Sequence, residues 1–259
     1  MNKIICLCLA LTIFVFSSVG FAANKFNLKP TKLPVITFYT ENFPPANYME
    51  NNELVGITVD SLKLIWADLN LPDQEVTIVP WTRGYRNVLK QPNSALFTMS
   101  KIEAREDLFK WVGPFFKSVH VLMAKKSSNL KFDNFGDVLN HKIATIQGDI
   151  SEISLLQMGF PDFNMAKVQN LERAFIMLQS GRVDMMMVSM HGFQHLTDRL
   201  NADASKYEQV WRVNQIGNYL AFNKKTPDKV IQAYQKSLDN VASERTLIKK
   251  KYNLPQIEY

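Results

Sequence analysis

Short strands and amphipathic helices alternate along almost the whole chain, and this alternation limits the possible folds more than any other feature. Residues 35–39 are β-branched and aromatic, as is typical of a strand. In residues 58–69, apolar side chains recur at the spacing of a helix. Further strands are predicted at 75–79, 95–98, 142–145 and 183–188, and further helices at 83–90, at 151–158, after Asn170 and after Pro227. The order predicts an α/β protein with mainly parallel sheets flanked by helices.

Two local patterns refine this prediction. Within the predicted strand 183–188, residues 185–188 are all apolar, as expected of a strand with both faces covered, so Met185, Met186 and Met187 are interpreted as core residues. Asn170 is a suitable N-cap for the following helix, and Gly181 a suitable stop. No stretch rich in Pro, Gly and Ser divides the chain, so any two lobes should be joined by ordered strands.

The first 22 residues have the pattern of a secretory signal peptide. Lys3 precedes an apolar run at 4–16, and small residues at Gly20 and Ala22 favour cleavage after Ala22. The alternative is a retained membrane anchor, but the run is short beside the about 20 residues that a spanning helix needs. Cys6 and Cys8 are the only cysteines, so a cleaved chain has neither disulfides nor a cysteine nucleophile.

The chain has a formal net charge of +6, but its basic residues are dispersed. There is no basic stripe interleaved with aromatic residues, so nucleic acid is not expected as a partner. A hydrophobic fraction of 46% is ordinary for a globular protein and excludes wholesale disorder.

Four stretches, at 39–60, 80–86, 97–115 and 144–184, carry the most specific motifs. The quoted segments are Tyr39-Thr-Glu-Asn-Phe-Pro-Pro, Pro80-Trp-Thr-Arg-Gly-Tyr-Arg, Phe97-Thr-Met-Ser-Lys-Ile-Glu-Ala-Arg and Ala144-Thr-Ile-Gln-Gly-Asp, with Gly181-Arg-Val-Asp. Their order and spacing resemble the family 3 extracellular solute-binding proteins, which are periplasmic receptors of the amino-acid type for ABC importers.

This resemblance implies a type II periplasmic-binding-protein-like fold with a ligand cleft between two lobes. The first lobe would comprise 33–116 and the return segment 215–259, and the second lobe 117–214. It also implies a bacterial source, a periplasmic location, a small polar solute as ligand and an ABC permease of the inner membrane as partner. We expect a monomer without cofactor and without enzymatic activity. The alternatives are a receptor that docks on a sensor protein, and a dehydratase-type enzyme on the same fold.

Arg105 is the principal candidate for ligand binding. Its planar guanidinium group can pair with a carboxylate through two hydrogen bonds, and it resembles the family arginine that holds the ligand's α-carboxylate. The alternative is a surface ion pair with Glu103 or Asp107. Thr98 and Ser100 lie on one face of the preceding strand, where their hydroxyl groups could add hydrogen bonds.

Further candidates lie where strands end. Phe43 matches the family aromatic that stacks on the ligand, and Glu41 could contact a cationic group; the alternatives are a loop residue over the core and a solvated carboxylate. Trp81 and Arg83 follow a predicted strand, at the edge where open α/β proteins bind ligands. They suit a flat or anionic ligand, unless Trp81 lies on the lobe surface.

In the second lobe, Asp149 either caps the following helix or meets a ligand ammonium group. The chain departs from the family at Ser189, where the resemblance calls for the aspartate that holds an α-ammonium group. A standard α-amino-acid pocket is therefore in doubt. His191, just beyond, is expected to face the cleft. His191 and His195 have the four-residue spacing of a zinc pair, but no third ligand is evident, so no metal is expected.

Overall fold

The structure, a computed structural model, describes residues 33–252. The predicted signal peptide at 1–22 and the last residues of the return segment, 253–259, lie outside the described residues. The account below concerns the folded unit that starts at Pro34.

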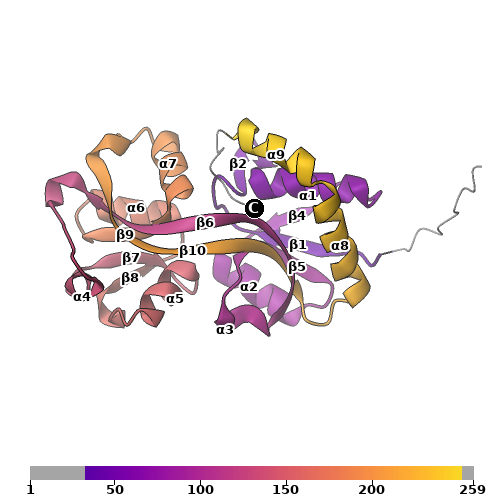
Figure 1. Cartoon of the computed structure of the whole chain (residues 1–259), viewed down its shortest axis with the longest axis horizontal. Coiled ribbons are helices and arrows are strands. Elements are labelled where there is room, and N and C mark those ends of the chain that lie inside the picture. The colour runs from indigo at the N-terminus through magenta and orange to yellow at the C-terminus, as the bar shows by residue number, and fades with distance from the viewer. Residues whose placement is uncertain (1–32, 253–259) are drawn as a thin grey trace, which may run out of the picture. The chain divides into compact units, whose positions relative to one another are not determined.

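One eight-stranded sheet organises this unit, in the order β4-β1-β5-β10-β6-β9-β7-β8 (Figure 1). The strands are β1 (Thr37–Thr40), β4 (Val76–Ile78), β5 (Ser94–Ser100), β6 (Phe109–Lys125), β7 (Ile143–Ile146), β8 (Met165–Val168), β9 (Met185–Ser189) and β10 (Tyr207–Asn223). The outer strands pair in parallel at both ends of the sheet, whereas β10 and β6 pair antiparallel with each other and with their neighbours β5 and β9. The predicted parallel sheets are therefore present, but antiparallel strands join them into one continuous sheet.

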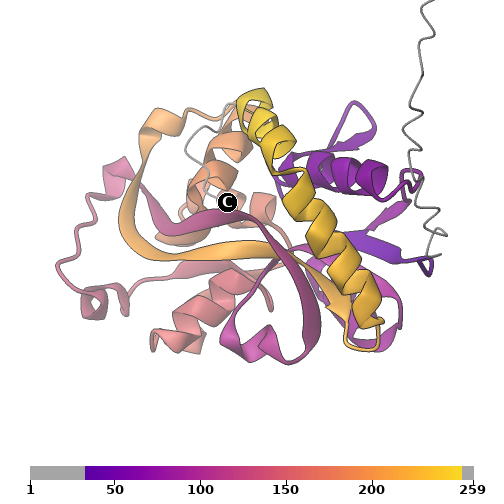
Figure 2. The same ribbon diagram turned by 45° about the vertical axis from the view of Figure 1, so that its right-hand side comes forward.

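The two central strands connect the lobes. β6 and β10 are 17 residues each and stay paired from Tyr207, opposite Lys125, to Asn223, opposite Phe109 (Figure 2). At about 3.3 Å per residue each strand extends for roughly 56 Å, enough to pass through both halves of the sheet. We call the part around β1, β4 and β5 the first lobe, and the part around β7, β8 and β9 the second lobe. The predicted boundaries, 116/117 and 214/215, fall inside these two strands, and where the lobes divide stays a prediction.

The second lobe has a core on each face of its sheet, because alternate residues of a strand point to opposite faces. Met186 and Val188 pack with Phe175 of α6 (Leu171–Gln179) and Phe193 of α7 (Met190–Arg199). Met185 and Met187 pack on the other face, in a cluster that includes Leu155 of α5 (Ile150–Gln157). The interpretation of residues 185–187 as core filler is confirmed.

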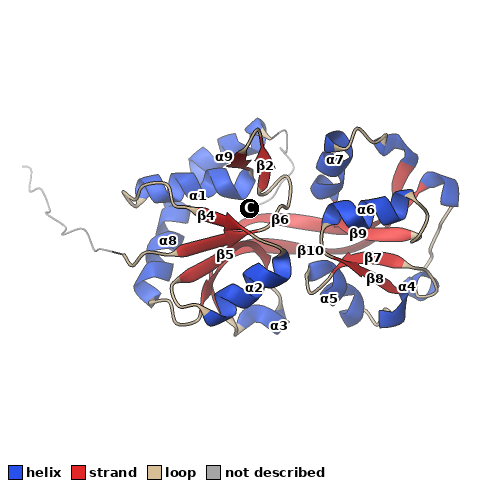
Figure 3. Ribbon diagram, turned by 180° about the vertical axis from the view of Figure 1, so that it is seen from behind, coloured by secondary structure: helices blue, strands red, loops and turns tan. Residues whose placement is uncertain are grey.

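Helices cover the sheet of the first lobe on both sides (Figure 3). Phe38 of β1 packs edge-on against Trp66 of α1 (Ile57–Asp68) and near Tyr234 of α8 (Asp228–Asn240), which also meets Phe222. The other face carries α2 (Trp81–Lys90), whose first residue joins a cluster with residues of β1, β5 and β6. Helix α9 (Ala242–Lys251) follows α8 and contacts α1.

The short elements are β2 (Tyr48–Glu50), β3 (Glu53–Val55), α3 (Glu103–Glu106), α4 (Phe135–Val138) and the 3-10 turns η1 (Lys126–Ser128), η2 (Asp162–Asn164) and η3 (Ala204–Lys206). Asn170 caps α6 as predicted, since its Oδ1 accepts a hydrogen bond of 2.9 Å from the amide of Arg173. Between residues 33 and 252, none of the helices has the length and apolar character needed to cross a membrane.

Candidate functional site

The candidate site lies where strands of both lobes end. Glu41 follows β1, Trp81 follows β4, Ser100 ends β5 and Asp149 follows β7, and ligands of open α/β proteins bind at such carboxyl edges. A narrow space there, the inner space, is lined by Glu41, Phe43, Trp81, Thr98, Ser100, Arg105, Asp149, Ile150 and Asn218. Its volume is about 20 Å³, enough for about one water molecule. Of the predicted ligand-binding residues, only Arg83, Ser189 and His191 do not line it.

Arg105, in α3, is buried between the lobes. It is 2% exposed, which excludes the alternative of a surface arginine paired with Glu103 or Asp107. Its Nη1 donates to the carbonyl of Ser100 at 3.3 Å, and its Nη2 donates to the carbonyl of Gly148, in the second lobe, at 3.0 Å. Burial lowers the pKa of Arg105, while Asp149, Tyr85 and Glu41 act in the opposite direction.

Aromatic rings complete the surroundings of this guanidinium group. Its Cζ lies 5.0 Å from the ring centroid of Trp81 and 5.5 Å from that of Tyr85. Cation–π contacts of this kind favour a fixed, planar orientation of arginine. The sequence interpretation included Trp81 but missed Tyr85, although its position four residues after Trp81 on a predicted helix was a usable signal.

Two carboxyl groups accompany Arg105. Burial, and secondarily the charge of Asp149, raises the pKa of Glu41 to about 8, although Arg105 opposes this. Burial raises the pKa of Asp149 to about 6 against the hydrogen bonds from Ser151. The inner space therefore holds one cation beside two carboxyl groups that resist ionisation, a setting in which a further cationic group would be favoured.

Asp149 also caps α5. Its Oδ1 accepts hydrogen bonds from the amide of Ser151 at 2.7 Å and from the Ser151 hydroxyl at 2.5 Å, and the amide of Glu152 lies 3.4 Å away. Both interpretations of this residue are thus compatible, because one carboxylate lines the inner space and caps the first turn of the helix.

Thr98 belongs to a buried polar network behind the inner space. Its hydroxyl donates to Oδ1 of Asn47 at 2.6 Å and lies 2.8 Å from the hydroxyl of Thr58. Asn47 in turn donates to the carbonyl of Glu41 at 2.7 Å. Thr98 therefore helps to fix the loop that carries Glu41. The sequence interpretation missed Asn47, which lies in the stretch 39–60, and Asn218, which no local pattern marks.

The carbonyl of Gly148 joins the two lobes. Besides the bond from Arg105, it accepts a hydrogen bond of 2.9 Å from Nε1 of Trp81, which is 4% exposed and therefore not a surface residue. Gly148 has a φ of +71°, a conformation that glycine adopts readily and other residues rarely. The loop after β7 thus depends on glycine to hold its carbonyl between Trp81 and Arg105.

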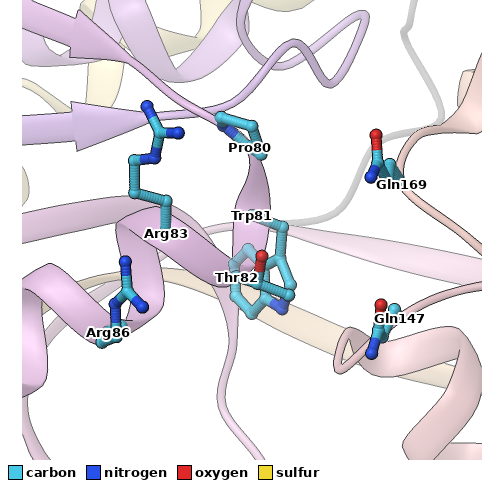
Figure 4. A pocket seen from close by; sticks show the side chains of 7 residues that line it. All are labelled: Pro80, Trp81, Thr82, Arg83, Arg86, Gln147 and Gln169. Carbon is cyan, nitrogen blue, oxygen red and sulfur yellow. The ribbon is translucent and has the colours of Figure 1, made fainter.

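A larger cavity of about 430 Å³, the outer cavity, lies on the other side of Trp81. It is lined by Pro80, Trp81, Thr82, Arg83, Arg86, Gln147 and Gln169. Figure 4 shows the two glutamines, from the second lobe, facing Trp81 and Thr82, with the arginines beyond them on α2. Arg83 is therefore separate from Arg105, and the sequence interpretation missed the other polar residues of this cavity.

Ser189 and His191 line neither cavity. Ser189 is 3% exposed, and its Oγ accepts a hydrogen bond of 3.1 Å from the amide of Gly192, which caps α7. His191 is half-buried, and burial lowers its pKa. The ring of His195 packs on Tyr48, with centroids 4.4 Å apart. Within residues 33–252, no cluster of three or more His, Cys, Asp or Glu side chains is placed to hold a metal ion.

Known proteins resemble this chain in sequence family and in fold. The family model described as "Bacterial extracellular solute-binding proteins, family 3" matches residues 35–252. No curated protein matches the sequence of this chain. Three solved structures illustrate this fold at low sequence identity, and two of these three come from transport systems. A histidine kinase sensor domain with similarity to periplasmic binding proteins has a TM-score of 0.76 at 15% identity, covering 84% of this chain and 95% of its own.

The second is a substrate-binding protein of an ABC uptake transporter from Streptococcus pneumoniae, solved with bound histidine. It has a TM-score of 0.74 at 13% identity over 83% of this chain and 91% of its own. The third, a substrate-binding protein of an amino acid ABC transporter, has a TM-score of 0.73 at 18% identity over 85% of this chain and 99% of its own. These likenesses establish a two-lobed periplasmic-binding-protein fold.

Proposed function

We propose, for a chain that belongs to the bacterial extracellular solute-binding proteins, family 3, that it captures a small carboxylate-bearing solute between its lobes. In this proposal the protein acts in the periplasm, after cleavage near Ala22, and presents the solute to an ABC importer. Amino acids and related carboxylates are the proposed ligands. The burial of Arg105 between the lobes is the observation that carries the proposal.

The contacts of Arg105 are those of a closed cleft without ligand. Its guanidinium group meets carbonyl oxygens from both lobes, which occupy donors suited to a carboxylate. The inner space of about 20 Å³ is too small for an amino acid. Ligand entry therefore requires the second lobe to move away with Gly148, and the ligand carboxylate would then replace this carbonyl. Long strands such as β6 and β10 permit such a hinge motion.

Glu41 and Asp149 are the proposed partners of a ligand ammonium group. They supply one carboxyl group from each lobe, which compensates for Ser189 in place of the family's aspartate. Phe43, Thr98 and Ser100 line the same space, and we assign them to shaping and positioning. In this proposal all these groups bind and none performs a chemical step.

A sensor role is the second candidate, because a histidine kinase sensor domain shares the fold with a TM-score of 0.76. Both roles use the same ligand-driven closure and differ in the protein that recognises the closed form. Pull-down of the liganded protein with either an ABC permease or a sensor kinase from the same genome distinguishes them. We propose a monomer in either case.

A thermal-shift screen over amino acids, organic acids and polyamines tests the proposal, followed by calorimetry of each hit. A ligand at 100 times its dissociation constant should stabilise the fold by about 2.7 kcal/mol. Arg105→Ala should abolish the shift. The matched control is Arg199→Ala, because Arg199 is exposed and pairs at 3.0 Å only with Glu172 on the surface. Hits that bind both variants equally well would refute the assignment of Arg105.

An enzymatic role has a direct test as well. Glu41, with its raised pKa, has the protonation state that a dehydratase-type enzyme needs in a proton donor. We expect no turnover when prephenate or arogenate is incubated with the protein and product absorbance is followed. Turnover that disappears in Glu41→Gln would replace the binding proposal with an enzymatic one.

A further inference from the structure

The outer cavity differs from the inner space in charge. Arg83 and Arg86 are three residues apart on α2, so they lie on one face of the helix, and both line the cavity. No aspartate or glutamate is among the residues that line it. The inner space, by contrast, sets two carboxyl groups against one arginine. The inner space thus combines carboxyl groups with one arginine, whereas the charged residues of the outer cavity are both arginines.

Four polar side chains of the outer cavity have no hydrogen-bonding or ionic partner among the described residues. In the part of the chain that the structure describes, the side chains of Arg83, Arg86, Gln147 and Gln169 make no hydrogen bond or ion pair. Other arginines differ: Arg199 pairs with Glu172, and Arg212 donates to Gln215. The outer cavity therefore presents guanidinium and amide donors to whatever occupies it.

The glutamines come from the opposite lobe. Gln147 follows β7 and Gln169 follows β8, so both move with the second lobe, while Arg83 and Arg86 move with the first. Amide groups donate and accept hydrogen bonds without charge. A group held here would therefore be contacted from both lobes, and the cavity would keep the two positive charges of the arginines.

The wall between the two spaces is the contact of Trp81 with Gly148. Trp81 lines both the inner space and the outer cavity, and its indole N–H meets the carbonyl of Gly148. Ligand entry must already displace Gly148, because the inner space has room for about one water molecule. When Gly148 moves, the inner space and the outer cavity become one channel along Trp81.

We infer that the outer cavity is a subsite for a second anionic group of the same ligand, so that the ligand is an elongated solute with acidic groups at both ends. The first acidic group pairs with Arg105, and the second, a carboxylate or a phosphate-type oxyanion, pairs with Arg83 and Arg86. This inference rests on the proposed function, since it takes Arg105 as the first anchor. The cavity of about 430 Å³ is large enough for the body of such a solute.

The test is calorimetry at low ionic strength, because salt screens exposed arginines. The probes are α,ω-dicarboxylates from succinate to suberate and their 2-amino derivatives, each compared with its ω-monomethyl ester. A parallel series carries a phosphonate at the ω end and separates the two oxyanion types. For the preferred chain length, we expect the diacid to bind about three- to thirtyfold more tightly than its ester, as two exposed charge contacts provide.

The double variant Arg83→Gln/Arg86→Gln should bring the ratio of diacid affinity to ester affinity close to one. Arg182→Gln is the matched control, because Arg182 is exposed and precedes β9. It therefore lies at the amino ends of the parallel strands β7 and β9, whereas Gln147 of the cavity follows the carboxyl end of β7. Equal binding of diacid and ester, or a preference that persists in the double variant, overturns the inference. If no probe binds the wild type, the inference is likewise overturned.

The two proposals fail in different ways. Binding that needs Arg105 but is indifferent to Arg83 and Arg86 overturns the outer subsite and keeps the proposed function. Binding that is unaffected by Arg105→Ala overturns the proposed function itself.

Discussion

Arg105 donates hydrogen bonds to carbonyl oxygens of both lobes. These contacts depend on the planar shape of the guanidinium group as well as on its positive charge. A lysine ammonium group at this site would keep the positive charge but lose the planar fork and the flat contacts with Trp81 and Tyr85. Charge and shape therefore contribute separately at this residue, and Arg105→Ala and Arg105→Lys distinguish the two contributions.

For Arg105→Ala we expect ligand affinity to fall roughly 30- to several-thousand-fold, since removing one partner of a buried charge pair costs about 2–5 kcal/mol. Arg105→Lys should recover only part of the loss. Calorimetry with a ligand from the screen measures both variants. Full recovery in Arg105→Lys would show that charge alone is recognised and that the two-pronged geometry is irrelevant.

Glu41 gives the ligand-free protein a distinctive pH dependence. Its pKa is raised from 4.5 to about 8, so between these values the folded chain holds a proton that the unfolded chain has lost. The free energy of unfolding contributed by Glu41 therefore falls as the pH rises through this window and is constant above it. Urea denaturation of Glu41→Gln should show a growing advantage over the wild type from pH 5 to pH 8. The control is Glu53→Gln, at the exposed first position of β3, and we expect no such trend in it.

At the scale of elements, the helix α5 and the cleft share Asp149. Asn and Asp are about equally good N-caps, whereas alanine loses about 0.5–2 kcal/mol at such a position. Asp149→Asn should therefore keep the stability of the fold, and Asp149→Ala should lose it to that extent in urea denaturation.

Ligand binding distinguishes the proposed contact of Asp149 with a ligand ammonium group from its role as a helix cap. At pH 7 both Asp149→Asn and Asp149→Ala should weaken ligands that carry an ammonium group by about ten- to hundredfold. Carboxylates without an amine should bind all three proteins alike. If Asp149→Asn binds amine-bearing ligands as the wild type does, the carboxylate serves only as a helix cap.

The elements differ in how well the sequence predicts them. Helix α1 was predicted at 58–69 and spans Ile57–Asp68. The prediction is close because five apolar residues mark the buried face of the helix. The long strands β6 and β10 were expected only as ordered connections between two lobes, without bounds. Gly113 and Pro114 interrupt the pattern of β6, and β10 is half-buried along most of its length, so neither has a clean alternation. Their mutual pairing, which makes the sheet continuous, is a long-range property that local patterns do not encode.

The prediction of site residues from the sequence has the same limit. Residues next to strand ends, such as Glu41, Trp81 and Asp149, were found because the carboxyl edge of a sheet follows from strand order. Gln169, Arg86 and Asn218 were missed, since nothing local marks a polar residue as one that faces a cleft. Ser189 was predicted at the ligand, but its hydroxyl caps α7 in this conformation.

At the scale of the whole molecule, one carbonyl connects the lobes at the proposed ligand site. Gly148 accepts hydrogen bonds from Trp81 and Arg105, so in the proposed function the ligand-free closed form is held by groups that the ligand would engage. Weakening these hydrogen bonds should favour the open form. Trp81→Phe removes the indole N–H and keeps an aromatic ring beside Arg105, so it tests the hydrogen bond to Gly148 with a small change in packing.

Losing one such hydrogen bond, worth about 0.5–1.5 kcal/mol, should raise the ratio of open to closed molecules about two- to tenfold. Spin labels on Lys90→Cys, at the end of α2, and Phe163→Cys, which is 86% exposed in η2, report the distance between the lobes by pulsed electron resonance. Trp81→Phe without ligand should shift the distribution to longer distances, and saturating ligand should restore the shorter ones. Trp111→Phe is the control, because its indole donates at 3.0 Å to the carbonyl of Glu106 within the first lobe. An unchanged distribution in Trp81→Phe, or the same shift in Trp111→Phe, would mean that Gly148 does not hold the lobes together.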